Sequence, residues 1–228
     1  MKTFLTFLLF LFAYITVSAQ NDFGVGVNGG VDIPVGDFHK FYSLGSGGDV
    51  KLIYSVKNSF LLVLTSGYHV WQVDEESFNK VSNEQNLRTE FNIDSHFRTI
   101  PIYIGIRYYL GAGKHRPFFS LDFGGYSYEF KLSGTRTKSL PDAVGAPVDI
   151  PETKKTDTQT ALAVGFGYFY RLNNEWYIEV KSKYSVLSSA YTINEPGKIV
   201  NPENEEIAYG KSGKLNFITI SAGINYMF

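Results

Sequence analysis

The stretch FITISAGINYMF, residues 217–228, decides the fold of this chain. Apolar residues alternate in it with small or polar ones up to the last position. One face carries Ile218, Ile220, Ala222, Ile224, Tyr226 and Phe228, and the other carries Thr219, Ser221, Gly223 and Asn225. Side chains of a β-strand alternate between its two faces, so this pattern predicts a strand with one apolar face. A soluble domain usually ends in a frayed polar tail. We therefore expect the last strand to pair with the first.

Seven further stretches show the same alternation. They are residues 22–33, 47–56, 59–71, 97–110, 117–132, 158–171 and 175–189. The pattern is cleanest in 97–110 and least clean in 59–71, which carries apolar residues on both faces. Together these stretches make eight strands of about ten or more residues, the length that crosses a bilayer at a tilt of about 45°.

The connections between these strands alternate between short and long. VKNS, GAGKHR and LNNE form the short ones, whereas the long ones cover residues 34–46, 72–96, 133–157 and 191–213. In an up-and-down meander, all short turns then lie at one end and all long loops at the other. Outer-membrane barrels have this layout, with short periplasmic turns and long outer loops. The sequence therefore predicts an all-β, eight-stranded antiparallel up-and-down transmembrane β-barrel.

The N-terminus, MKTFLTFLLFLFAYITVSAQ, has the form of a secretory signal peptide. One lysine precedes an apolar run over residues 4–15, and small residues follow at a cleavage site. The run is shorter than the roughly 20 residues of a membrane-spanning helix, so a retained anchor is the weaker alternative. We expect a cleaved signal peptide at 1–19 and an outer-membrane barrel domain at 20–228. The chain has no cysteine, so no disulfide can hold it.

The less apolar face of the predicted strands is rich in glycine and carries seven charged residues. These are Asp49, Lys51, Arg107, Asp122, Glu179, Lys181 and Lys183. An eight-stranded barrel has an interior only just wide enough for side chains, which suits small residues there. Buried charges must pair, because desolvating them alone is very costly. We therefore expect a barrel-interior charge network that leaves no open pore.

Aromatic residues lie near strand ends on the apolar face, as in the girdles at membrane–water boundaries. They are Phe23, Tyr54, Tyr108, Tyr168, Tyr170, Trp176, Tyr226 and Phe228. The alternative is a secreted lipocalin-like soluble barrel with an apolar interior that binds an apolar ligand. That alternative explains the strand alternation equally well, but it explains the long loops at one end less well.

Two longer stretches and the C-terminal strand resemble a known family. TIPIYIGIRYYLGAGKHRPFFSLDFGGY (99–126) and GGVDIPVGDFHKFYSLGSGGDV (29–50) resemble the small outer-membrane β-barrel domain family of Gram-negative bacteria, which includes PorT-like and OmpX-like barrels. The C-terminal strand looks like the signal that the barrel-assembly machinery reads, with Ile220, Ile224, Tyr226 and Phe228 as its apolar positions. The resemblance implies an outer-membrane location. PorT-like members are tied to protein secretion, which makes a secretion or cell-surface complex a further expected partner beside outer-membrane lipid.

Motifs for catalysis, cofactors or metals are weak in this chain. Gly24–Gly29 matches GxGxxG, but the glycines alternate within a strand instead of opening a helix. GAGKHR lacks the Ser or Thr of a P-loop. The histidines, His39, His69, His96 and His115, show no metal-ligand spacing. A net charge of −1 argues against nucleic acid as a partner. We expect no cofactor and no metal.

Two groups hold Ser, His and Asp close together in sequence, as a hydrolase requires. They are Asp37, His39 and Ser43, and Asp94, Ser95 and His96, and neither lies in a recognisable motif. Acidic loop residues could bind divalent cations, but a solvated surface explains them better: Asp74, Glu75, Glu76, Glu203, Glu205 and Glu206. The expected role is therefore structural, surface-interacting or secretion-accessory, without catalysis. A narrow channel for small solutes is the alternative.

Overall fold

The computed structural model describes residues 23–40, 42–57, 59–76, 79, 89–111, 113–140, 143–144, 146–201 and 206–228. The expected signal peptide at 1–19 lies outside these residues. The elements are β1 (Phe23–Val35), the 3₁₀ turn η1 (Gly36–Lys40), β2 (Gly45–Lys57), β3 (Phe60–Gln72), β4 (Thr89–Tyr109), β5 (His115–Leu140), β6 (Ala143–Val144), β7 (Val148–Arg171), β8 (Trp176–Asn201) and β9 (Glu206–Met227). No helix among the described residues is both long and apolar enough to span a membrane.

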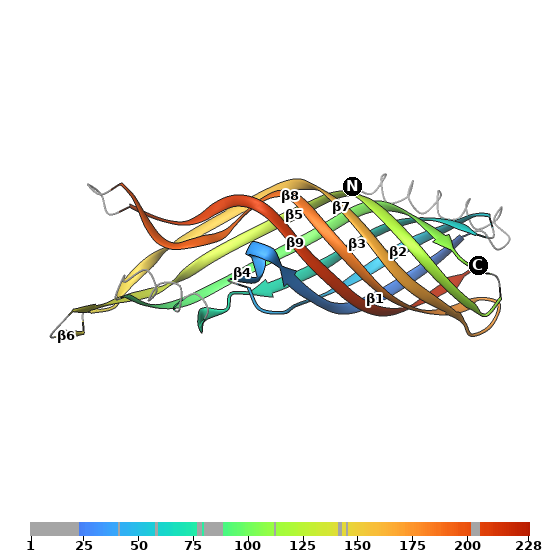
Figure 1. The fold of residues 1–228 in the computed structure, drawn as a ribbon, viewed down its shortest axis with the longest axis horizontal. Helices are drawn as coiled ribbons and strands as arrows, with labels where there is room; N and C mark the ends of the chain where they lie inside the picture. Colours follow the sequence, from blue (N-terminus) through green and yellow to red (C-terminus); the bar gives the residue numbers. More distant parts are fainter. Residues whose placement is uncertain are drawn as a thin grey trace, which may run out of the picture.

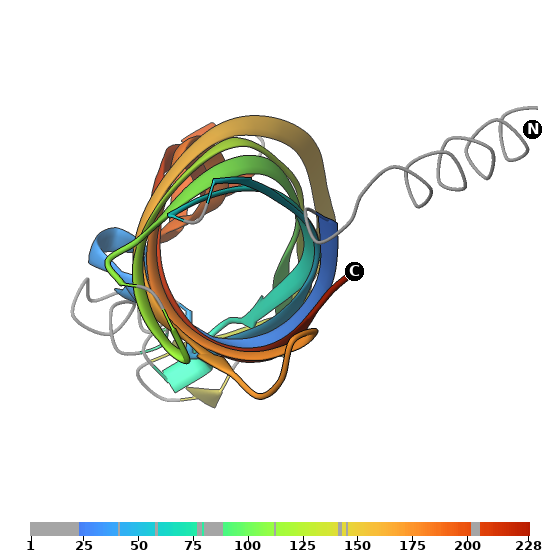
Figure 2. The same cartoon turned by 90° about the vertical axis from the view of Figure 1, so that its right-hand side faces the viewer.

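Eight of the strands form a closed antiparallel barrel, and the short β6 pairs only with the end of β5. The barrel closes because β1 pairs with β9, in a register that runs from Gly24↔Met227 to Val35↔Asn216. The backbone N–H of Phe228 also donates to the carbonyl of Phe23, at 2.8 Å. The predicted fold class and the pairing of the last strand with the first are confirmed. Figure 1 shows the tilted strands from the side, and Figure 2 shows the ring that they form.

Three of the connections and the C-terminus define one end of the barrel. The turns β2–β3, β4–β5 and β7–β8 lie at one end, together with the C-terminus (Figure 1, right). We call this the turn end and the opposite one the hairpin end. Closed pairing leaves the barrel wall without an unpaired edge, as lipid requires.

Two segments predicted as loops, 133–157 and 191–213, are instead mostly strand. β5 extends to Leu140, and β7 begins at Val148. In the same way β8 extends to Asn201, and β9 begins at Glu206. The β7–β8 ladder stops at Ala161↔Leu187, so two hairpins project separately from the barrel (Figure 1, left). The prediction was wrong because it rested on apolar periodicity. Hairpin pairing satisfies the backbone hydrogen bonds of polar segments without an apolar face.

The strands place apolar side chains on the outside of the barrel. Ile102, Ile104 and Phe123 are 57–59% exposed although they lie in mid-strand. Four acids and four Lys or Arg side chains are instead buried in the interior. This polarity is the reverse of a lipocalin-like soluble barrel, so that alternative is wrong. In a bilayer the exposed apolar side chains face lipid.

The eight aromatic residues predicted on the apolar face lie near the turn end. Phe23 contacts Tyr54 with ring centroids 4.8 Å apart, and Trp176 contacts Tyr226 at 5.0 Å. All eight predicted aromatic positions lie next to a short turn or a terminus of the barrel. They therefore form one girdle, at the turn end.

Candidate functional site: the barrel interior

Glu179 on β8 is the centre of the buried charges. Its Oε2 lies 2.5 Å from Lys51 Nζ of β2 and 2.9 Å from Arg107 Nη1 of β4. Asn225 of β9 donates to the same oxygen at 3.2 Å, and Asn28 of β1 donates to Oε1 at 3.4 Å. One carboxylate thus receives four donors from four other strands. These bonds cross the interior and tie opposite walls of the barrel together.

A second chain of ionic contacts lies nearer the hairpin end. His69 on β3 contacts Asp32 through Nδ1 at 2.7 Å and Asp49 through Nε2 at 3.2 Å. Thr219 donates to the other oxygen of Asp32 at 2.5 Å, and Lys181 lies 3.6 Å from Asp49. All five side chains are buried. The buried imidazole therefore links β1, β2 and β3 through two carboxylates.

Aromatic rings contact two of the interior cations, Lys183 and Arg107. The ammonium of Lys183 donates to the hydroxyl of Tyr103 and lies 4.1 Å from the ring centroid. The guanidinium of Arg107 lies 5.2 Å from the Phe118 ring and also interacts electrostatically with Asp122. A desolvated cation over an aromatic face is favoured by the ring quadrupole. We call the whole set the charge network: Asp32, Asp49, Lys51, His69, Arg107, Asp122, Glu179, Lys181 and Lys183.

An apolar layer closes the interior on the hairpin side of the charge network. It is formed by buried side chains of several strands, including Trp71, Phe97, Phe130 and Phe217. Phe38 of η1 joins them, with its ring centroid 5.5 Å from that of Trp71. The sequence did not predict this layer, because η1 falls in a segment expected to be a loop. The sequence signal for the contribution of η1 was Phe38, a single apolar residue between Asp37 and His39.

A second apolar layer closes the interior on the turn side. Its buried members are Ile53, Leu61, Val63, Tyr109, Phe118 and Phe169. The charge network is therefore enclosed between two apolar layers, and its ions are desolvated on both sides.

The structure brings all seven predicted interior charges into this enclosed space. Two members of the charge network, Asp32 and His69, were not predicted. His69 lies in the stretch with apolar residues on both faces, which hid its orientation. Asp32 stands one residue from the predicted strand end, where an acid is also common in a turn. The register against β9 (Asp32↔Thr219) is what assigns it to the interior.

The four C-terminal positions expected as an assembly signal lie on the lipid-facing side of β9 and beyond its end. Ile220, Ile224 and Phe228 are 46–47% exposed, and Tyr226 is half-buried. Ile220, Ile224 and Tyr226 pair with β1, and the backbone N–H of Phe228 donates to Phe23, the first residue of β1.

In neither of the two candidate hydrolase groups do the Ser, His and Asp side chains come together as a catalytic site. Ser95 and His96 lie on opposite faces of β4, and Ser95 donates to the carbonyl of Lys131 at 2.7 Å. In the other group, Asp37 pairs with Lys40 at 2.7 Å, while Ser43 donates to the carbonyl of Gln72 at 3.3 Å. The Asp37 pKa is lowered by this bond to Lys40.

Histidine and acidic side chains can also bind metal ions. In the described part of the chain, no three His, Cys, Asp or Glu side chains come together in a way that could hold a metal ion. Of the acidic loop residues, Glu203 and Glu205 lie outside the described part of the chain.

Charged side chains also meet on the outer surface, on the hairpin side of the apolar belt. Lys154 Nζ lies 2.8 Å from Glu129, and this bond lowers the pKa of that carboxyl. Partial burial and the neighbouring Arg98 lower the pKa of His96. The side chains of Arg98 and Glu129 are 44% and 28% exposed, so the cluster is a solvated surface network.

Comparison with known proteins places this geometry in a family. The solved structure of OprG from Pseudomonas aeruginosa is 12% identical with a TM-score of 0.50, and the match covers 92% of this chain and 98% of that one. Neisserial surface protein A, NspA, is 12% identical with a TM-score of 0.49, over 90% of this chain and 97% of that one. Ail, the attachment invasion locus protein of Yersinia pestis, is 13% identical with a TM-score of 0.48, over 92% and 100%. At such identities the likeness concerns the fold.

No curated protein matches the sequence of this chain. Residues 4–228 match the family model described as outer membrane protein beta-barrel domain. The match includes every barrel strand and therefore every residue of the charge network. The chain belongs to this outer-membrane β-barrel family and is a protein of the outer membrane.

Proposed function

We propose that this chain serves as a closed outer-membrane barrel, with a structural, surface-interacting or secretion-accessory role and no catalysis. The observation that carries the proposal is the position of Glu179, which receives donors from four other strands between two apolar layers. A solute moving through the barrel would have to separate these buried pairs. Breaking a buried ion pair costs about 3–5 kcal/mol, so a conducting path is disfavoured.

The proposal includes a route to the membrane. The segment 1–19 acts as a cleaved signal peptide, and the barrel-assembly machinery reads Ile220, Ile224, Tyr226 and Phe228. The turn end then faces the periplasm, and the projecting hairpins face outward. The hairpins β5–β7 and β8–β9 extend beyond the barrel wall, which makes them accessible to a protein at the cell surface.

Planar-bilayer recording tests the closed interior. The purified barrel is reconstituted at rising protein concentration, with matched detergent as the baseline and an open porin as the positive control. We expect no steady current above the baseline. Large, steady, protein-dependent currents would overturn the proposal and support a narrow channel for small solutes.

Co-purification from native membranes tests the role of the hairpins. The matched variant replaces residues 136–148 by a two-residue turn, cutting β5–β7 at the pair Thr135↔Asp149. We expect a surface partner to be retained by the complete chain and lost from the variant. Equal recovery of every partner with both proteins would contradict a role for this hairpin.

A further inference from the structure

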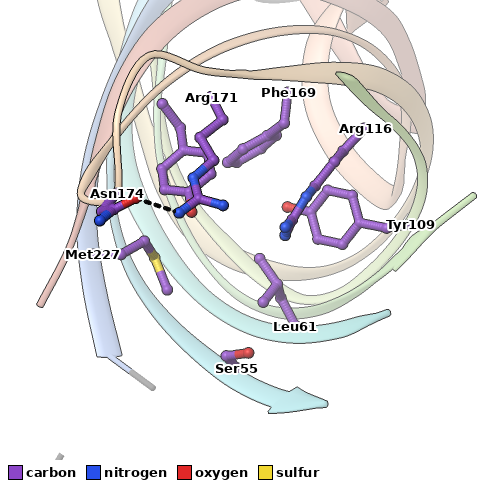
Figure 3. Close-up of a pocket in the computed structure, with 9 residues that line it drawn as sticks. Ser55, Leu61, Tyr109, Arg116, Phe169, Arg171, Asn174 and Met227 are labelled. Carbon is purple, nitrogen blue, oxygen red and sulfur yellow. Dashed lines mark hydrogen bonds between the residues drawn. The ribbon is translucent and has the colours of Figure 1, made fainter. Parts of the chain in front are cut away.

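A cavity of about 370 Å³ opens inside the barrel at its turn end. Its walls come from seven of the eight barrel strands and from the β7–β8 turn. Figure 3 shows Arg116 and Arg171 pointing into it from β5 and β7. Its size is in the range of small-molecule sites. The cavity lies outside the turn-side apolar layer and is therefore separate from the charge network.

The two arginines differ from the interior cations Lys51 and Arg107. Among the described residues, neither Arg116 nor Arg171 forms an ion pair, whereas Lys51 and Arg107 share Glu179. Arg116 uses Nε to bind the carbonyl of Gly113 at 3.0 Å. Arg171 binds the carbonyl of Asn173 through Nε at 2.9 Å and Asn174 Oδ1 through Nη2 at 2.7 Å.

These bonds fix the direction of each guanidinium but leave most of its donors unused. A guanidinium has five N–H donors in a rigid fork. Arg116 spends one on the protein and Arg171 spends two, so several remain for a ligand. Such forks match a carboxylate or phosphate with two parallel hydrogen bonds.

The inner wall of the cavity is apolar and aromatic. Leu61, Tyr109 and Phe169 are buried there, and the half-buried Tyr177 and Met227 complete the wall. A small hydrated anion would contact the arginines but leave the exposed parts of Tyr177 and Met227 in contact with water. An apolar body attached to the anionic group would cover these two side chains and gain burial energy.

We infer that this cavity is a binding site for an amphiphilic anion, an apolar or aromatic group that carries a carboxylate. The free C-terminus of a polypeptide ending in an apolar residue has this chemistry, and so does a small aromatic acid. The carboxylate lies between the two guanidiniums, and the apolar part packs on Leu61, Phe169 and Met227. This inference does not depend on whether the barrel conducts.

Methionine labelling gives a reporter inside the cavity. The chain has two methionines, Met1 and Met227, so ¹³C-methyl labelling yields one cavity signal and at most one remote signal. The folded, detergent-solubilised protein is titrated with N-acetyl-phenylalanine, with N-acetyl-phenylalanine amide, with an acetylated tripeptide ending in phenylalanine, and with inorganic phosphate. We expect both free carboxylates to shift the Met227 signal saturably, at least tenfold more tightly than the amide and phosphate. Tighter binding of the tripeptide assigns the site to polypeptide termini, and tighter binding of the single residue assigns it to small acids.

Three variants locate the anion. Arg116→Gln and Arg171→Gln should each weaken carboxylate binding about tenfold or more and leave amide binding unchanged. Arg98→Gln, the matched control on the outer surface, should leave both unchanged. Equal binding of the acid and its amide by the unmodified protein would overturn the inference without any variant. It would also be overturned if phosphate bound as tightly as the acid, or if Arg98→Gln weakened binding as much as the cavity variants did.

Discussion

Lys51 on β2 and Glu179 on β8 meet across the interior of the barrel, 2.5 Å apart and with both side chains fully buried. Arg107 reaches the same carboxylate oxygen from β4 at 2.9 Å. Three strands that are not neighbours in the sheet are therefore held by one acid. The contact acts as an internal cross-brace of the barrel.

Glu179→Gln removes the charge of this brace while keeping its shape. Lys51 and Arg107 would then be buried without a counter-ion, which costs about 3–5 kcal/mol. Denaturant unfolding of the barrel in lipid vesicles should show a loss of that size. Glu175→Gln, an exposed position in the preceding turn, is the matched control and should change stability by less than about 0.5 kcal/mol. Equal effects of the two substitutions would contradict the role assigned to Glu179.

Ile220→Arg tests the lipid-facing side of β9. An arginine on the lipid face near the bilayer midplane destabilises a barrel by about 2–4 kcal/mol. The same vesicle-based unfolding assay measures it. Leu44→Arg is the control, because Leu44 is 66% exposed between η1 and β2 and lies outside the strands. If Ile220→Arg inserts and unfolds like the control, Ile220 does not face lipid.

Gly47→Ala tests the packing of His69. A Cβ at Gly47 would lie 2.2 Å from His69 Nδ1, the atom that contacts Asp32. We expect the imidazole to be displaced and stability to fall by about 1–3 kcal/mol, the cost of an unsatisfied buried polar group.

The control for this substitution is Gly29→Ala on the adjacent strand. A Cβ at Gly29 points outward and lies 3.9 Å from its nearest neighbour, the carbonyl oxygen of Gly47. Stability should stay the same or rise by up to about 1 kcal/mol, because alanine restricts the unfolded chain. Indistinguishable unfolding midpoints for the two alanine variants would argue against the close approach of Gly47 and His69.

The sequence predicted the elements whose two faces differ in polarity. In β9, every apolar residue from Ile218 to Tyr226 falls on alternate positions, and this is enough to predict both the strand and its lipid-facing side. The register between strands is set by pairing and closure, which no single stretch encodes. Asp32 and His69 contact each other only because β1, β2 and β3 align side by side, so their contact could not be read from either stretch.

The hairpin extensions of β5 and β7 were hidden for a different reason. Most of their described side chains are exposed or half-buried, with Ile150 as a buried exception, and a strand largely in water on both faces has no apolar period. The burial of Phe38 likewise depends on η1 folding back against β1 and β9. Such tertiary contacts are decided by the assembled barrel.

Spin-label accessibility along β9 tests the central claim, the reversed polarity of the barrel, most directly. The chain has no cysteine, so single substitutions Ile220→Cys, Ala222→Cys, Ile224→Cys and Lys214→Cys can be labelled without background. In reconstituted vesicles, labels at the first three positions should collide readily with dissolved oxygen and poorly with a water-soluble nickel chelate, whereas the label at Lys214 should show the reverse. Free access of the nickel chelate to positions 220, 222 and 224 would contradict an apolar surface in contact with lipid.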